Sequence, residues 1–200
     1  MEFELYYDYL CPFVYRAWLL LGDVASQRRL DISWRYFSLA QVNSKEEGWA
    51  AWTAPAGERV RGRLAFKAAE AARRQDRFDS FHTALLRARH QDRVDIDDVK
   101  VIERLAEDSG LDLDRFRKDL EEPTILAALE RDHTHAVATL GVFGTPTFVF
   151  PNGASAYIRL AEAIAGDDAL HVFDSVLAVA SDEPRILEIK RPNRPSRTEA

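Results

Sequence analysis

The alternation of apolar and polar positions divides the chain into a β-α-β segment, a long helical block and a second segment that begins with strands. Residues 2–7, EFELYY, have the pattern of a strand, and an apolar helical pattern follows from Pro12 to about Gln27. A second strand is predicted at residues 31–37. A helix between two such strands implies parallel pairing and a right-handed crossover.

The middle of the chain predicts a loop followed by almost continuous helix. Glycine and proline punctuate residues 43–62, which also contain Trp49 and Trp52. We expect these tryptophans to anchor the loop on the core, and lining a substrate groove is the alternative. Helical patterns then follow at about 63–74, 76–90, 95–109, 112–121 and 123–140.

Strand patterns return after Gly141. A glycine–proline turn leads into a short strand that ends at Phe150, and residues 154–158 fit its antiparallel partner across a turn. Residues 159–180 are predicted to be helical, with an interruption at 166–168. Beyond them we expect an extended segment at 185–189 and a mobile basic tail from Lys190.

Without its helical block, the chain keeps a four-stranded mixed sheet with flanking helices, which is an α/β fold of the thioredoxin-like kind. We therefore expect residues 1–42 and 141–180 to form a thioredoxin-like domain. Residues 43–140 form a loop and a large helical insertion between the second strand and the glycine–proline loop. Residues 181–200 are a C-terminal extension, partly mobile.

Composition narrows the class of protein. The 200 residues are 46% hydrophobic and 30% charged, as expected of a globular protein with a substantial core. A net charge of −6 argues against nucleic acid as the main partner. No apolar run approaches the ~20 residues that span a bilayer, and the N-terminus lacks the pattern of a secretory signal. We therefore expect a cytoplasmic protein that does not enter membranes.

The chain contains one cysteine, Cys11, at the predicted junction of strand and helix. Pro12 suits the first helical position. A thiol there faces unpaired N–H groups and the positive end of the helix dipole, which favour the reactive thiolate. A small buried hydrophobe is the alternative role for a lone cysteine. One cysteine excludes an intrachain disulfide and a multi-cysteine zinc site, and we expect no metal.

Two motifs resemble those of a known family. Residues 8–15, DYLCPFVY, are similar to the D-x-x-C-P-x-C entry to the first helix in DsbA-like (FrnE-like) thiol–disulfide oxidoreductases of the thioredoxin superfamily. Residues 141–149, GVFGTPTFV, are similar to that family's cis-proline loop, and the helical insertion fits the same family. The family's second cysteine falls on Val14.

The resemblance implies thiol–disulfide exchange with Cys11 as the nucleophile. Because Val14 cannot resolve a mixed disulfide, the reaction would follow a monothiol cycle that an external low-molecular-weight thiol such as glutathione completes. Cys11 sulfenic acid captured by an external thiol is a related route. No tightly bound cofactor is expected.

The resemblance also assigns the surroundings of the thiol. A small thiol or disulfide, or an extended thiol-bearing peptide, would bind beside it, the peptide pairing with the backbone of Thr145 before a cis-Pro146. A trans proline is the alternative. The implied substrate-binding residues are Pro12, Phe13, Val14, Thr145 and Pro146. Asp8, Tyr15 and His133 are accessory candidates, for which packing is an equally ordinary role.

Two other functions stay open. In the kappa-class glutathione transferases and hydroxychromene-carboxylate isomerases, which share this fold, the residue at the position of Cys11 holds or activates a bound thiol. A non-catalytic binding module that keeps only the groove is the third alternative. The sequence does not decide the oligomeric state, so a homodimer is open too.

Overall fold

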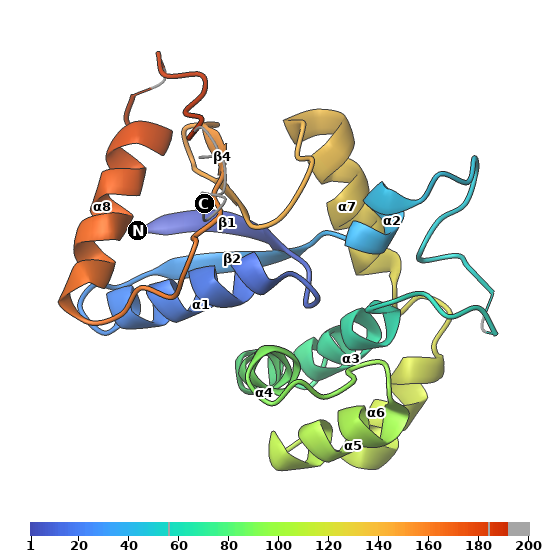
Figure 1. The fold of residues 1–200 in the computed structure, drawn as a ribbon. Helices are drawn as coiled ribbons and strands as arrows, with labels where there is room; N and C mark the ends of the chain where they lie inside the picture. Colours follow the sequence, from blue (N-terminus) through green and yellow to red (C-terminus); the bar gives the residue numbers. More distant parts are fainter. Residues whose placement is uncertain (56, 184, 192–200) are drawn as a thin grey trace, which may run out of the picture.

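Four strands form one mixed sheet in the computed structural model, which describes residues 1–55, 57–183 and 185–191 (Figure 1). The strand order is β2-β1-β3-β4. β1 pairs with β2 in parallel and with β3 antiparallel, and β4 pairs antiparallel with β3. The strands are β1 (Glu2–Tyr7), β2 (Asp31–Tyr36), β3 (Thr147–Val149) and β4 (Ser155–Tyr157).

The central strand β1 is buried on both faces. Phe3, Leu5 and Tyr7 belong to the main core, whereas Tyr6 belongs to a smaller cluster on the other face, as the two-residue period of a strand requires. The sheet therefore needs cover on both sides.

Helices provide this cover. α1 (Pro12–Ala25) and α8 (Asp167–Ala180) pack together over the main core, and Arg28 binds Asp174 of α8 through two hydrogen bonds of 2.6 and 3.1 Å. α7 (Ala127–Leu140) covers the other face, where Ala136 meets Tyr6.

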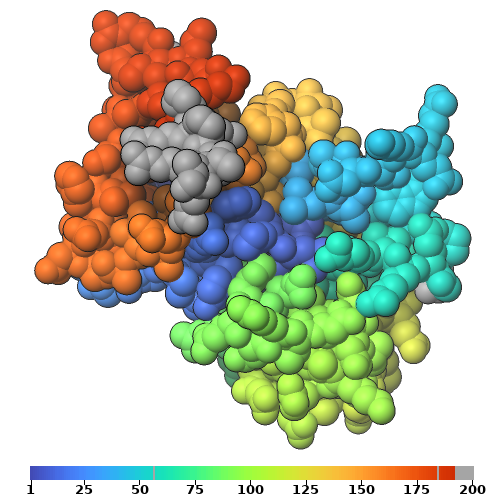
Figure 2. Space-filling model, viewed as in Figure 1, coloured from blue at the N-terminus to red at the C-terminus, as the bar shows by residue number. Residues whose placement is uncertain are grey.

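The remaining helices lie between β2 and α7 in the sequence, and most of them form a lobe beside the sheet, green in Figure 2. The lobe shares one continuous hydrophobic core with β1 and α1. Asp98 and Asp112 cap two of its helices by accepting from backbone N–H groups. The helices are α2 (Leu39–Asn43), α3 (Arg63–Arg73), α4 (Phe78–His90), α5 (Val99–Asp108) and α6 (Leu113–Glu121).

The predicted four-stranded mixed sheet and its helical insertion are confirmed. The helix predicted from residue 159 is wrong in its first part, because α8 begins only at Asp167, after Gly166 with φ 65°. The short α2, capped by Ser38, was not predicted. No strand forms at 185–189.

The domain boundaries stay a prediction. α7 lies within the predicted insertion of residues 43–140 but packs against the sheet, which favours counting it with the thioredoxin-like part. Most of the expected mobile tail, residues 192–200, lies outside the described residues.

A buried hydrogen-bond chain joins the sheet to the insertion. Tyr7 donates to the Tyr9 hydroxyl at 3.3 Å, and Tyr9 lies 2.9 Å from Nδ1 of His82 on α4. Burial, assisted by the charge of Arg73, lowers the pKa of His82 to about 3. The folded protein therefore holds His82 neutral.

His82 should make the folded protein less stable as the pH is lowered. Between pH 7 and pH 5 the imidazole in the unfolded chain, with its ordinary pKa near 6.5, binds a proton, whereas the folded His82 stays neutral. This difference should lower the free energy of unfolding by about 2 kcal/mol. In urea unfolding, we expect the wild type to lose about 2 kcal/mol more stability than His82→Phe when the pH is lowered from 7 to 5.

The slope of unfolding free energy against pH is compared between variants, so contributions from other groups cancel. One of these is Asp8: burial raises its pKa to about 6, and it stabilises the folded protein as pH falls. His171→Gln, at an exposed position of α8, is the matched control and should keep the wild-type slope. Equal slopes for wild type and His82→Phe would contradict the prediction.

Candidate functional site

Cys11 is the N-cap of α1, and local geometry fixes it there. Its N–H donates to the Asp8 carbonyl at 3.1 Å, and its own carbonyl accepts from Val14 N at 3.1 Å. Pro12 occupies the first helical position, where a missing N–H costs nothing. The strand-to-helix turn predicted from the sequence is therefore present.

The Cys11 sulfur points to the opposite loop. Sγ donates to the Thr145 carbonyl at 3.3 Å, across 134 residues of sequence, and the Thr145–Pro146 peptide is cis. The sulfur makes no capping hydrogen bond to the helix N–H groups, contrary to the orientation expected from the sequence. Cys11 is only 4% exposed. The S–H···O contact is one that a thiol makes and a thiolate cannot.

Two hydrogen bonds, one within the loop and one from the residue after β4, hold the loop beside the sulfur. Thr147 Oγ1 donates to the Gly144 carbonyl at 2.8 Å, and Ile158 N donates to the Pro146 carbonyl at 3.1 Å. The Thr145 hydroxyl is buried without a hydrogen-bond partner among the described residues. This hydroxyl can therefore offer a hydrogen bond to a group that enters beside the thiol.

The five predicted substrate-binding residues differ in accessibility. Pro12 is exposed and Phe13 is partly exposed, so both are available to a ligand. Val14 is fully buried in the main core, where it packs and cannot contact a ligand directly. Thr145 and Pro146 are both buried, and the Thr145 carbonyl accepts from the Cys11 sulfur.

Asp8 fixes the turn that carries Cys11. Its carboxylate accepts from Leu10 N at 2.8 Å and from Leu39 N at 2.7 Å, and it is 1% exposed. Burial raises its pKa to about 6, against the two backbone hydrogen bonds, and Asp97 adds to the rise. Asp8 thus ties the Cys11 turn to the start of α2.

The other two accessory candidates have packing contacts. Tyr15 stacks on Trp18 and His90, with ring centroids 5.7 and 5.2 Å apart. His133 accepts from Ser38 N at 3.2 Å and packs against Trp52. Burial lowers the pKa of His133 to about 4. None of the hydrogen bonds or ring contacts found for His133 joins it to Cys11 or Thr145.

The two tryptophans of the 43–62 loop make different contacts. Trp52 packs against the main core, and Trp49 donates to Glu58 at 2.8 Å. The expected anchoring on the core fits Trp52, whereas the Trp49 hydrogen bond stays within the loop, because Glu58 belongs to the same segment.

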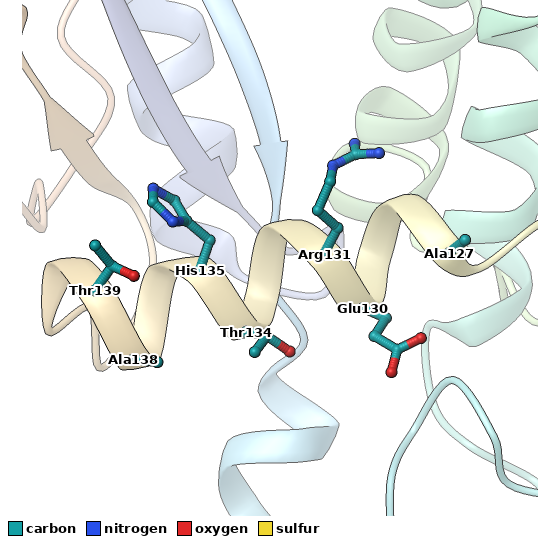
Figure 3. A pocket seen from close by; sticks show the side chains of 7 residues that line it. All are labelled: Ala127, Glu130, Arg131, Thr134, His135, Ala138 and Thr139. Carbon is teal, nitrogen blue, oxygen red and sulfur yellow. The ribbon is translucent and has the colours of Figure 1, made fainter.

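A surface depression lies on the outer face of α7 (Figure 3). His135 lines it, whereas His133 is buried on the opposite side of the helix, as their two-residue spacing requires. The depression contains none of the candidate site residues. Its lining residues are Ala127, Glu130, Arg131, Thr134, His135, Ala138 and Thr139.

Sequence reasoning missed four side chains that surround Phe13 and the cis-proline loop: Arg16, Phe143, Tyr157 and Arg159. Phe143 is 68% exposed and meets Tyr157 edge to face at 4.9 Å. One spacing could have revealed Arg16, which follows Phe13 by one helical turn. No comparable local signal marks Phe143 or Arg159, because β4 ends at Tyr157 and Arg159 lies beyond it.

The fold and the thiol define a class. A mixed sheet of this order, with a thiol at the first strand–helix junction and a cis-proline beside it, is the arrangement of thioredoxin-fold proteins. The model of the DSBA-like thioredoxin domain matches residues 2–178. The chain belongs to this family.

Solved structures share the fold. A probable DsbA oxidoreductase, SCO1869, from Streptomyces coelicolor superposes with a TM-score of 0.65 at 20% identity, covering 100% of this chain and 95% of the other. A 2-hydroxychromene-2-carboxylate isomerase gives 0.63 at 17% identity, with 89% and 95% covered. The cytosolic disulfide reductase DsbM from Pseudomonas aeruginosa, solved with GSH, gives 0.60 at 17%, with 90% and 100% covered.

In sequence, the chain is 27% identical to the uncharacterized protein Rv2286c of Mycobacterium tuberculosis over 98% of this chain and 84% of the relative. Within the described residues, no helix is long and apolar enough to cross a membrane. The same residues contain no group of three or more His, Cys, Asp or Glu side chains placed to hold a metal ion.

Removing the Asp8 carboxylate should destabilise the protein. Asp8→Ala leaves the N–H groups of Leu10 and Leu39 without their acceptor, and we expect a loss of about 1–3 kcal/mol in urea unfolding at pH 7. Asp8→Asn should lose less, because its amide oxygen can keep one of the two hydrogen bonds.

Asp114→Ala is the control, since the Asp114 side chain is 92% exposed and its ion pair with Arg117, at 3.6 Å, lies in solvent and contributes little. We expect it to stay within about 0.5 kcal/mol of the wild type. If Asp8→Ala were as stable as this control, the carboxylate would not hold the turn.

Proposed function

We propose that this protein is a DsbA-like thiol–disulfide oxidoreductase that works by a monothiol mechanism through Cys11. The observation that carries the proposal is the position of the Cys11 thiol, at the start of α1 and 3.3 Å from the carbonyl before cis-Pro146. Membership of the DSBA-like family supports it. Val14, where the family has its second cysteine, limits the chemistry to one thiol.

The reaction takes two exchange steps. The Cys11 thiol gives up its proton and the thiolate attacks one sulfur of a disulfide, so a Cys11–substrate disulfide forms and the other half leaves as a thiolate. An external thiolate then attacks the substrate sulfur of this mixed disulfide. The substrate and the external thiol leave together as a new mixed disulfide, and Cys11 is released as a thiolate. The external thiol supplies the electrons, and we expect it to be a low-molecular-weight thiol such as glutathione.

The surroundings of the sulfur set the conditions for attack. Because the thiol donates to Thr145, deprotonation must break this contact and free the sulfur to move toward a substrate. A residue that is 4% exposed also favours a small disulfide over a bulky one. An extended thiol-bearing peptide remains an alternative substrate, pairing beside Thr145.

A second candidate function is a glutathione-transferase or isomerase role. The low exposure of Cys11 and its S–H donor contact favour it, since such a thiol can hold a bound thiol without forming a disulfide. A 2-hydroxychromene-2-carboxylate isomerase has a similar fold. A non-catalytic binding module is the third candidate.

We also propose that the protein acts in the cytoplasm on a thiol or disulfide, without nucleic acid, membrane, metal or tightly bound cofactor. The DsbM structure solved with GSH supports glutathione as the external thiol, because a protein of the same fold accommodates it. A homodimer stays open.

Covalent trapping distinguishes the candidates. Under the first proposal, incubation with oxidised glutathione yields one glutathione adduct in the intact mass, and reduced glutathione removes it. Cys11→Ser should form no adduct and should lose turnover with a small disulfide. Wild-type turnover in Cys11→Ser would contradict the monothiol mechanism.

Calorimetry with reduced glutathione completes the comparison. Tight binding by the wild type and by Cys11→Ser, with no covalent adduct, would favour the transferase or isomerase role. Neither adduct nor binding, together with slow alkylation of Cys11 by iodoacetamide, would favour the binding module.

Val14→Cys should restore the missing step. Val14 lies one helical turn from Cys11, and its N–H donates to the Cys11 carbonyl. With a thiol there, a mixed disulfide on Cys11 is attacked from within the chain, and an internal disulfide should form. We expect the wild type to accumulate the glutathione adduct and Val14→Cys to accumulate the internal disulfide.

The matched control is Ala17→Cys, another buried position of α1, one turn further along the helix. It adds a thiol outside the family's motif and should keep the adduct on Cys11. Accumulation of the adduct on Val14→Cys would show that the missing cysteine is not what limits resolution.

A further inference from the structure

Aromatic and guanidinium groups form a connected surface beside Cys11. Phe143 meets Tyr157 at 4.9 Å between ring centroids, and the Arg159 guanidinium lies 5.8 Å from the Tyr157 ring and 4.9 Å from the Phe13 ring. The Arg16 guanidinium also lies over the Phe13 ring, 5.4 Å from its centroid. We call these five residues the cationic aromatic surface.

This surface borders the thiol through the backbone. Phe13 is the second residue after Cys11, and Phe143 is the second residue before Thr145, whose carbonyl holds the thiol. Tyr157 crosses the cis-proline loop, because a Cβ added to Gly144 would lie 3.2 Å from the Tyr157 ring. A molecule attached to the Cys11 sulfur would therefore reach the surface.

The two arginines are available to an anion. Arg16 uses one nitrogen to bind the Leu160 carbonyl at 2.8 Å, and Arg159 is exposed. Among the described residues, neither forms a salt bridge with a carboxylate. Two arginines without acidic partners beside the thiol are notable in a chain of net charge −6.

We propose that the cationic aromatic surface binds the carboxylate and the neighbouring apolar group of a small organic disulfide whose sulfur reacts with Cys11. The proposal rests on the proposed function and names its substrate class, an amphipathic anion. The guanidinium groups offer paired N–H donors to a carboxylate, and the rings of Phe13, Phe143 and Tyr157 offer contact to an apolar or aromatic group.

The two parts of the surface support one another. A guanidinium that stacks on a ring keeps its in-plane N–H donors free, so the cation–π contacts orient Arg159 without using up its hydrogen-bonding capacity. Stacking also reduces the rotamer freedom that a long side chain loses when it binds a ligand. The arrangement therefore suits an anion that carries an apolar group.

A pair of aromatic disulfides tests the proposal. Dithiobis(nitrobenzoate) carries carboxylates, and dithiodipyridine is neutral at pH 7. We expect Arg159→Gln to lower the rate at which Cys11 reacts with the carboxylated reagent about tenfold relative to its rate with the neutral one. Dividing by the wild-type ratio cancels the intrinsic reactivity of the two reagents.

Arg104→Gln is the matched control, because it removes the same charge at an exposed position of α5 in the insertion. It should leave the rate ratio at the wild-type value. The proposal is overturned if Arg159→Gln keeps the wild-type ratio, or if Arg104→Gln lowers the ratio equally, since the effect would then come from net charge.

A binding measurement separates this proposal from the proposed function. In a Cys11→Ser background no disulfide can form, and equilibrium dialysis with dithiobis(nitrobenzoate) should show binding that Arg159→Gln weakens about tenfold. Such binding in a protein whose Cys11 reacts with neither reagent would uphold the surface and reject the exchange mechanism. Reaction of Cys11 without this binding difference would uphold the mechanism and reject the surface.

Discussion

Residues 8–11 must satisfy three separate segments of the chain at once, and the geometry of the site depends on this constraint. The Asp8 carboxylate accepts from Leu39 N, the Tyr9 hydroxyl meets His82 in the insertion, and the Cys11 thiol donates to the Thr145 carbonyl. The turn after β1 is therefore where the sheet, the insertion and the cis-proline loop are joined. A shift in any one of these segments would change the position of the Cys11 sulfur.

Local patterns were sufficient to predict the sheet and the placement of the thiol. The alternation in β1 and Pro12 at the first helical position are short-range signals, because they follow from the periods and termini of single elements. The contacts around the thiol are not local. Nothing near Asp8 in the sequence indicates that its acceptor oxygen serves Leu39, and a carboxylate is mostly expected on the surface.

The same reason explains the other differences. The pattern at residues 159–166 suits a helix, yet the Leu160 carbonyl is held by Arg16 and the chain turns at Gly166 before α8 begins. The orientation of the Cys11 thiol could not be predicted from the helix terminus, because its partner lies 134 residues away. Capping reasoning identifies the N-terminus of a helix but not which competing acceptor a side chain there will choose.

The missing second cysteine and the cationic aromatic surface are linked by one argument. Val14 is fully buried in the main core, so valine at this position supplies no resolving thiol and fills the core with an apolar side chain. An enzyme that resolves its own mixed disulfide can release almost any partner. In the proposed monothiol cycle the mixed disulfide itself holds the partner until an external thiol attacks, so contacts beside the sulfur act earlier, by selecting which disulfide reacts. Phe13 and Arg159 lie where such contacts would be made.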